Sequence, residues 1–167
     1  KKFPKSKEKY FVLITHRQEH VIFGKTENRK MVDFVLRNFD RRLTCIFITH
    51  ETTKNFLKST GFDFSYWKGR GVKFSPRLSY IDFINLIRGA EFIVTDGGGN
   101  QEESYYLGLP CLIMRRKTER IEGLDENVIL AKGNITIIKN FLNNYSFFRR
   151  KPVRPKTMPS KIIIDYL

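Results

Sequence analysis

Short, uninterrupted apolar runs alternate along this chain with segments of helical periodicity. Residues 10–15 read YFVLIT and residues 43–49 read LTCIFIT, without the polar alternation of a half-exposed strand. Such runs are typical of strands buried on both faces. Helices between them favour an α/β fold with a parallel sheet that helices cover on both faces. Because crossovers are right-handed, the expected domain is Rossmann-like.

The same pattern places the individual elements. We expect strands at residues 10–15, 43–49, 71–74, 92–95, 110–114 and 127–131. We expect helices at residues 28–39, 52–59, 79–89, 100–107 and 136–143. Asn28 and Ser79 are helix-capping residues, and Gly89 and Gly108 are typical of helix ends. The first helix has an apolar face formed by Met31, Val32, Val35, Leu36 and Phe39.

The length of 167 residues allows one domain with a proper core. We expect this domain at residues 1–145. Residues 146–158 are basic and contain prolines, so we interpret them as a linker, and residues 159–167 as a C-terminal helix.

Composition narrows the function without fixing it. The chain has 31 Lys and Arg against 17 Asp and Glu, a formal charge of +14, so its natural partners are anions. No apolar run approaches the ~20 residues of a membrane span, and the charged start lacks the apolar stretch of a secretory signal. We therefore expect a cytoplasmic protein. Cys45 and Cys111 lie within apolar runs and are expected to be reduced core thiols rather than zinc ligands.

Polar segments follow three of the expected strands. They begin at His16, Asp96 and Arg115, and they supply a glycine-rich loop, several cations and a pair of carboxylates. Because ligands bind outside the carboxyl ends of parallel strands, we expect these segments to converge on one site.

The triple glycine Gly97, Gly98 and Gly99 lies between a strand and a helix. Without side chains, its backbone N–H groups can approach a phosphate at the positive end of the helix dipole. The sequence is neither a P-loop nor a dinucleotide fingerprint. A tight strand-to-helix turn is the alternative explanation.

Three side chains near this loop each have two interpretations. Glu103 either closes a capping box with Asn100 or accepts hydrogen bonds from ribose hydroxyls. Arg120 is either solvated or paired with phosphate. His16 is either structural or a donor or proton carrier near phosphate, which makes it the candidate catalytic residue. His50 is interpreted as structural, and Tyr66 and Trp67 are placed in a loop without a role.

Several motifs resemble one known family. The segments DFINLI (82–87), IVTDGGGNQEE (93–103), LGLPCLIMR (107–115) and TERIE (118–122) are similar to the C-terminal domain of non-hydrolysing UDP-N-acetylglucosamine 2-epimerases. That family has patterns close to T-D-S-G-G-x-Q-E-E, L-G-x-P-x-L-x-x-R and T-E-R-P-E. Residues 15–19 (THRQE) resemble its H-R-x-E segment. This chain departs from the family in having Gly97 for the serine and Ile121 for the proline.

The resemblance implies the C-terminal half of a B-type glycosyltransferase fold, with UDP held mainly by this half. It implies that Gly97, Gly98 and Gly99 bind the diphosphate and that Glu103 binds the ribose. By the same resemblance, Arg120 and His16 contact phosphate, while Phe83 and the backbone near Leu78 hold the uracil. The family inverts C2 of the sugar by elimination and re-addition of UDP, with no redox cofactor or metal. Its acid/base carboxylates lie in an N-terminal domain that is missing from this sequence.

The expected function is therefore the UDP-sugar-binding half of a UDP-N-acetylglucosamine 2-epimerase for polysaccharide precursor synthesis, inactive alone. The alternatives are half of a glycosyltransferase or UDP-sugar hydrolase, or a binding module for a separate catalytic chain. Nucleic-acid binding is the weakest alternative, because the aromatics form no RNA-binding motif. The full-length protein could form a homodimer.

Overall fold

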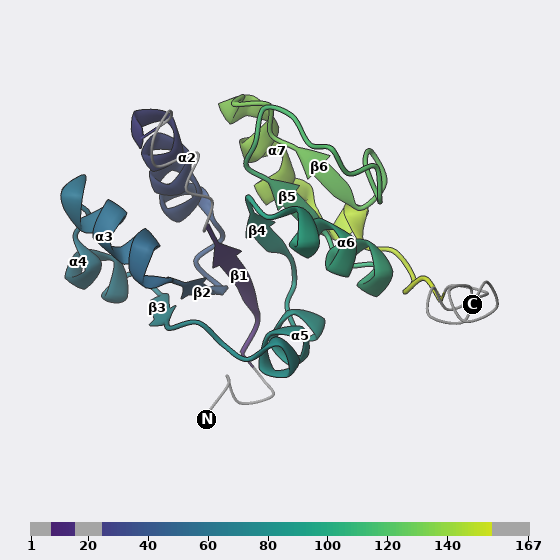
Figure 1. Cartoon of the computed structure of the whole chain (residues 1–167), viewed down its shortest axis with the longest axis horizontal. Coiled ribbons are helices and arrows are strands. Elements are labelled where there is room, and N and C mark those ends of the chain that lie inside the picture. The colour runs from purple at the N-terminus through teal and green to yellow at the C-terminus, as the bar shows by residue number, and fades with distance from the viewer. Residues whose placement is uncertain (1–7, 16–24, 155–167) are drawn as a thin grey trace, which may run out of the picture.

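The computed structural model, which describes residues 8–15 and 25–154, contains a six-stranded parallel sheet (Figure 1). The strand order is β3-β2-β1-β4-β5-β6. Every pairing between neighbours is parallel. The strands are β1 (Tyr10–Ile14), β2 (Thr44–Ile48), β3 (Val72–Ser75), β4 (Ile93–Thr95), β5 (Cys111–Ile113) and β6 (Val128–Leu130). All six expected strands are confirmed, and the Rossmann-like α/β class with them.

Helices connect the strands and lie on both faces of the sheet. They are α2 (Lys25–Asn38), α3 (Glu51–Ser59), α4 (Phe64–Lys68), α5 (Tyr80–Arg88), α6 (Gly98–Leu107) and α7 (Ile135–Asn144), followed by the 3₁₀ helix η1 (Tyr145–Phe148). The expected cap at Asn28 is wrong, because α2 already begins at Lys25. The expected loop at Tyr66 and Trp67 is also wrong. Asp63 caps α4 there by accepting a hydrogen bond from Tyr66 N, and Trp67 is buried.

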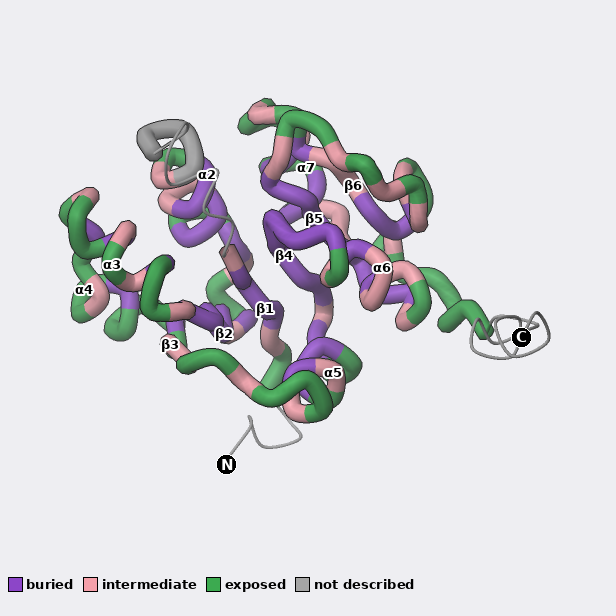
Figure 2. The backbone as a smooth tube through the Cα atoms, in the orientation of Figure 1, coloured by how far each residue is buried: buried purple, intermediate pink, exposed green. Residues whose placement is uncertain are grey.

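Successive residues of β1 point to opposite faces of the sheet, as the pleat of a strand requires. Phe11 and Leu13 belong to a core shared with α2, α3 and α7. Val12 and Ile14 belong to a second core, shared with α5. Figure 2 shows β1, β2, β4 and β5 largely buried between these layers, whereas the edge strands β3 and β6 are only partly buried. The apolar face predicted for the first helix is confirmed, since all five of its residues are buried. Each fully buried large apolar side chain contributes about 1.5–3 kcal/mol relative to exposure.

The strand order places a switch point between β1 and β4. From β1 the chain proceeds outward through β2 to β3, and α5 then returns it across the sheet to β4 on the other side of β1. The connections on the two sides of the switch point diverge, and this leaves a crevice at the carboxyl ends of these strands. Thr53 Oγ1 donates to the carbonyl oxygen of Thr15 (2.5 Å) and so ties the end of β1 to α3.

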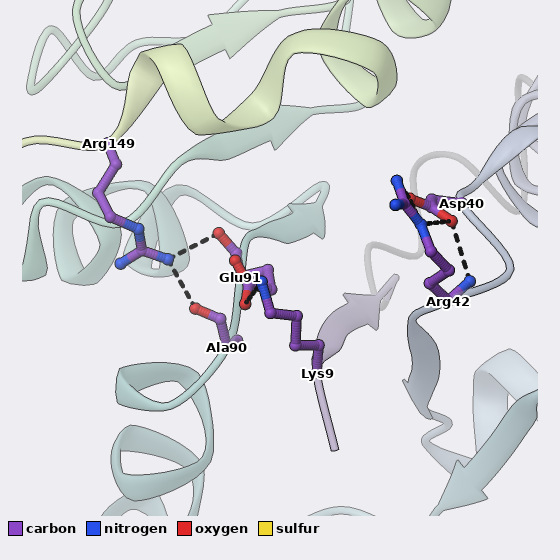
Figure 3. A network of polar contacts seen from close by, with 6 residues as sticks. All are labelled: Lys9, Asp40, Arg42, Ala90, Glu91 and Arg149. Carbon is purple, nitrogen blue, oxygen red and sulfur yellow. Dashed lines mark hydrogen bonds and ion pairs between the residues drawn. The ribbon is translucent and has the colours of Figure 1, made fainter. Parts of the chain in front are cut away.

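The basic segment after α7 lies along the opposite, amino edge of the sheet. Arg149 donates to the carbonyl oxygens of Ala90 and Glu91, both at 2.8 Å, and Glu91 also pairs with Lys9 (Figure 3). Arg150 N donates to the carbonyl oxygen of Gly108 (3.0 Å). Residues 146–153 thus pack on the domain. The division at residues 145 and 158 stays a prediction, and the expected helix at 159–167 lies outside the described residues.

None of the described helices is long and apolar enough to cross a bilayer.

Candidate functional site

A cleft of about 370 Å³ lies above the carboxyl ends of β1 and β2. Its walls come from the strand ends, the start of α3, the loop before α5, and the first turns of α5 and α6. The lining residues are Ile14, Ile48, His50, Arg77, Leu78, Tyr80, Phe83, Asn100 and Glu103. The structure therefore brings together Leu78, Phe83 and Glu103, three of the residues that the sequence singled out. His50, for which the sequence predicts a structural role, also lies on the cleft wall.

A capped helix start positions the apolar wall of the cleft. Ser79 Oγ accepts a hydrogen bond from Asp82 N (3.2 Å) and donates one to the Asp82 carboxylate (2.7 Å). This cap, which the sequence predicted, fixes the entry into α5. Leu78 precedes the cap and Phe83 lies one turn into the helix, so both reach the same wall. Phe83 is largely buried, and its exposed fraction is 8%.

The three glycines form the start of α6 rather than a loop before it. Gly97 is the N-cap, and Gly98 and Gly99 are the first two helical residues. The helix expected from Asn100 therefore begins earlier, and a capping box of Asn100 with Glu103 is wrong, because Asn100 is not the cap. None of the three glycines has a positive φ, so the backbone here does not require glycine for its conformation. What Gly98 and Gly99 provide is backbone N–H without side chains at the positive end of a helix.

The two helical glycines differ in their surroundings. A Cβ on Gly98 would lie 3.4 Å from side-chain atoms of Arg120 and Glu119. A Cβ on Gly99 would meet nothing within 4 Å, and Gly99 is exposed. The first turn of α6 is therefore covered by the 115–120 segment at Gly98 and accessible at Gly99. This confirms the expected convergence of the segments that follow β4 and β5.

Arg120 flanks the helix start and does not line the cleft. Its Nη1 atom pairs with the Glu102 carboxylate, and its Nε atom is buried without an acceptor among the described residues. Arg115 is arranged similarly. Its Nη2 atom pairs with Glu119 (3.0 Å), and its buried Nη1 atom has no acceptor within the described part of the chain. Among the described residues, therefore, Arg120 has an N–H donor without an acceptor at the start of α6, and Arg115 has one beside Glu119.

Gln101 fixes the 118–122 loop to α6, and sequence reasoning missed it. Its fully buried side chain donates to the carbonyl oxygens of Arg120 (3.2 Å) and Glu122 (3.0 Å) and accepts from Thr118 Oγ1 (2.9 Å). These three bonds hold Arg120 against Gly98. The signal available in the sequence was a glutamine directly after the glycines in a motif that also supplies Glu103.

Glu103 is a half-buried carboxylate facing the cleft. Burial raises its pKa, a hydrogen bond from Asn100 Nδ2 to Oε2 (2.9 Å) acts in the opposite direction, and the charge of Glu102 adds to the rise. A carboxylate here is a hydrogen-bond acceptor beside an apolar wall, which suits hydroxyl donors.

His16, the candidate catalytic residue, lies outside the described residues. The described residues contain no group of three or more His, Cys, Asp or Glu side chains that could hold a metal ion.

Comparison with known proteins relates this chain to one family. The sequence model of UDP-N-acetylglucosamine 2-epimerase matches residues 1–146. The UDP-N-acetylglucosamine 2-epimerase of Methanococcus maripaludis is 32% identical over 131 residues, which are 76% of this chain and 35% of that protein. The corresponding enzyme of Methanocaldococcus jannaschii is 31% identical over 135 residues, 36% of its length. The chain thus spans about a third of these relatives.

Solved structures give the same result. The UDP-GlcNAc 2-epimerase of M. jannaschii superposes with a TM-score of 0.81 at 27% identity, over 95% of this chain and 46% of the other. A second structure of that enzyme, in complex with UDP-GlcNAc and UDP, superposes with a TM-score of 0.78 at 26% identity over the same shares. Those shares fit the expectation of one half of a two-domain fold. Because the family's sequence model spans almost the whole described domain, this chain belongs to the UDP-N-acetylglucosamine 2-epimerase family.

Proposed function

We propose that this domain binds the UDP part of a UDP-sugar, as the nucleotide-binding half of a UDP-N-acetylglucosamine 2-epimerase. The observation that carries the proposal is the cleft that joins Leu78 and Phe83 with Glu103, beside the glycine-started helix α6. A nucleoside diphosphate has a flat base whose faces pack on apolar groups, then a diol, then an anion. The cleft offers an apolar wall and a carboxylate, and the start of α6 precedes Asn100 on the cleft wall.

The diphosphate is assigned to the first turn of α6. Gly98 and Gly99 present backbone N–H groups without side chains, and the helix dipole favours negative charge there. The Gly97 N–H, which the resemblance also assigns to the diphosphate, is engaged by Thr95 Oγ1. Arg120 is close enough to add a charge-assisted hydrogen bond, because its side chain packs on Gly98. We assign His16 to the same phosphate region from the family resemblance alone.

The nucleoside is assigned to the rest of the cleft. Phe83 and the backbone at Leu78 form the wall for the uracil, and Glu103 accepts from the ribose hydroxyls. The M. jannaschii relative bound to UDP-GlcNAc and UDP supports this ligand class, since its fold matches over 95% of this chain.

Epimerisation at C2 needs a base at the sugar in addition to a clamp on UDP. Among the described residues, Glu103 is at the nucleoside end and Glu102 is paired with Arg120. We therefore propose that the acid/base groups belong to an N-terminal domain, and that this half holds UDP while it is eliminated and re-added.

Titration calorimetry tests the binding proposal directly. UDP should release heat on binding to this chain and bind more tightly than ADP, because the wall at Leu78 and Phe83 is assigned to uracil. Equal affinities, or no heat from UDP, would refute it.

A further inference from the structure

A continuous series of hydrogen bonds runs from the start of α6 to Glu103. Gly97 N donates to Thr95 Oγ1 (3.0 Å), which in turn lies 2.9 Å from Asn100 Oδ1. Asn100 Nδ2 donates to Glu103 Oε2 (2.9 Å). Thr95 is fully buried, and Asn100 and Glu103 are half-buried at the cleft wall.

The donor and acceptor properties of these groups determine the position of each proton in this series. The Thr95 hydroxyl already accepts from the Gly97 N–H, so its own proton is the one directed at Asn100 Oδ1. With Oδ1 held in this way, the amide presents its NH₂ group to Glu103. The flipped amide would place Oδ1 against the carboxylate and NH₂ against the hydroxyl proton.

Asn100 does not act as a helix cap here. It is the third helical residue after Gly97, and its side chain bonds to the side chains of Thr95 and Glu103. What these bonds constrain is therefore the orientation of the Glu103 carboxylate.

We propose that Asn100 and Thr95 are positioning residues that orient Glu103 to receive a vicinal diol, the 2′- and 3′-hydroxyls of a ribonucleotide. This inference rests on the proposed function. An ionised carboxylate has about four lone-pair sites. The amide occupies one of them on Oε2, which leaves Oε1 and the remaining Oε2 site for two hydroxyls. Holding the carboxylate before the ligand arrives removes an ordering cost from binding.

The test compares UDP with 2′,3′-dideoxy-UDP by titration calorimetry. Wild type should prefer UDP. In Asn100→Ala and Thr95→Val, the affinity for UDP should fall about five- to tenfold while the affinity for the dideoxy nucleotide stays constant. Thr95→Ser keeps the hydroxyl and should keep the wild-type preference. Asn140→Ala, which removes an exposed amide from α7, is the matched control and should change neither affinity.

Asn100→Asp is a second variant of nearly the same shape, which places a charge against Glu103 and should also lose the preference. Thermal melts establish that each variant is folded. A wild-type preference in folded Asn100→Ala or Asn100→Asp overturns the inference, as does an equal loss of affinity for both nucleotides in Asn100→Ala. If wild type does not bind UDP, the proposed function fails and this inference with it. If wild type binds UDP and the variants keep its preference, only this inference fails.

Discussion

Arg120 is paired with Glu102 while its side chain lies against the first turn of α6, with Nε 3.4 Å from the position that a Cβ would take on Gly98. The pair holds the guanidinium at the start of the helix and neutralises it at the same time. A phosphate bound there must therefore compete with the Glu102 carboxylate for the arginine. Because the two side chains are 42% and 32% exposed, the pair itself contributes little to stability, about 0–1 kcal/mol.

The first prediction concerns Glu102. Glu102→Gln should tighten UDP binding about two- to fivefold, because it releases Arg120 and removes a negative charge near the phosphates. The gain should shrink at high salt. Glu51→Gln, which breaks an exposed pair with Lys54 on α3, is the control and should leave affinity unchanged. Calorimetry at two ionic strengths gives the answer. Weaker binding in Glu102→Gln would mean that the carboxylate is needed to hold Arg120 in place.

The second prediction concerns Arg120 itself. Arg120→Met keeps the packing of the side-chain stem on Gly98 but removes the charge, and it should cost about 1.5–3 kcal/mol of UDP affinity. The expected change in stability is small, since the pair with Glu102 is partly exposed. Calorimetry and a thermal melt on the same sample separate the two effects. An unchanged UDP affinity would mean that the phosphate does not contact Arg120.

The third prediction sets binding against stability at Glu103. Burial raises the pKa of this carboxyl in the folded state. The protonated Glu103 carboxyl is the form that the folded state favours. The stability that this preference contributes is therefore fully present below the unfolded pKa of about 4.3 and is lost as pH rises through the folded pKa. Glu103→Gln should be more stable than wild type at neutral pH, and the difference should vanish near pH 4. Denaturant unfolding across this range measures it. If the two proteins differed in stability by the same amount at pH 4 and at neutral pH, ionisation of Glu103 would not be the cause.

Removal of the Glu103 carboxylate should weaken UDP binding, although it stabilises the fold at neutral pH. Glu103→Ala leaves ribose hydroxyls without an acceptor and should cost about 1–3 kcal/mol of affinity. Wild-type affinity should itself fall as acid protonates Glu103. An unchanged UDP affinity in Glu103→Ala would mean that Glu103 does not bind the ribose.

The fourth prediction concerns the departure at Gly97. This residue is the N-cap of α6 with φ −93° and ψ 130°, an extended conformation that any residue adopts. Gly97→Ser should therefore fold normally and tighten phosphate binding by about 0.5–1.5 kcal/mol through one added hydroxyl donor. Calorimetry with UDP and uridine separates phosphate from nucleoside, since uridine affinity should not change. Weaker UDP binding would show that the serine hydroxyl is not directed at phosphate in this chain.

The strands and the apolar wall of the site were predictable because they depend on local signals. Uninterrupted apolar runs mark buried strands, and Ser79 followed by Asp82 marks the start of α5. The proximity of Glu103 to Phe83 was expected from the family resemblance, and the strand order seen in the structure accounts for it. The strands and the start of α5 follow from periodicity and capping signals, which the amino-acid sequence contains.

Features that depend on contacts distant in sequence could not be predicted in this way. The helix α4 is only five residues long, too short for a periodic signal, and is stabilised by burial of Trp67. The expected start of α6 at Asn100, and the capping box that was one of two interpretations of Glu103, do not hold because the helix begins within the glycines, which are poor helix formers. The pair of Arg120 with Glu102 spans 18 positions, and no pattern in the chain identifies it.

The last prediction is that this chain alone does not epimerise UDP-N-acetylglucosamine. Removal of the C2 proton needs a base within about 3 Å of it, while UDP is held at the same moment. The described residues can supply the second requirement through the start of α6 and Arg120. Glu103 lines the cleft and is assigned to the nucleoside in our proposal, and Glu102 is paired with Arg120. Proton NMR in deuterated water is the direct measurement, and no deuterium should enter C2 of the sugar. Exchange at C2, or any N-acetylmannosamine product, would place a catalytic base within this half.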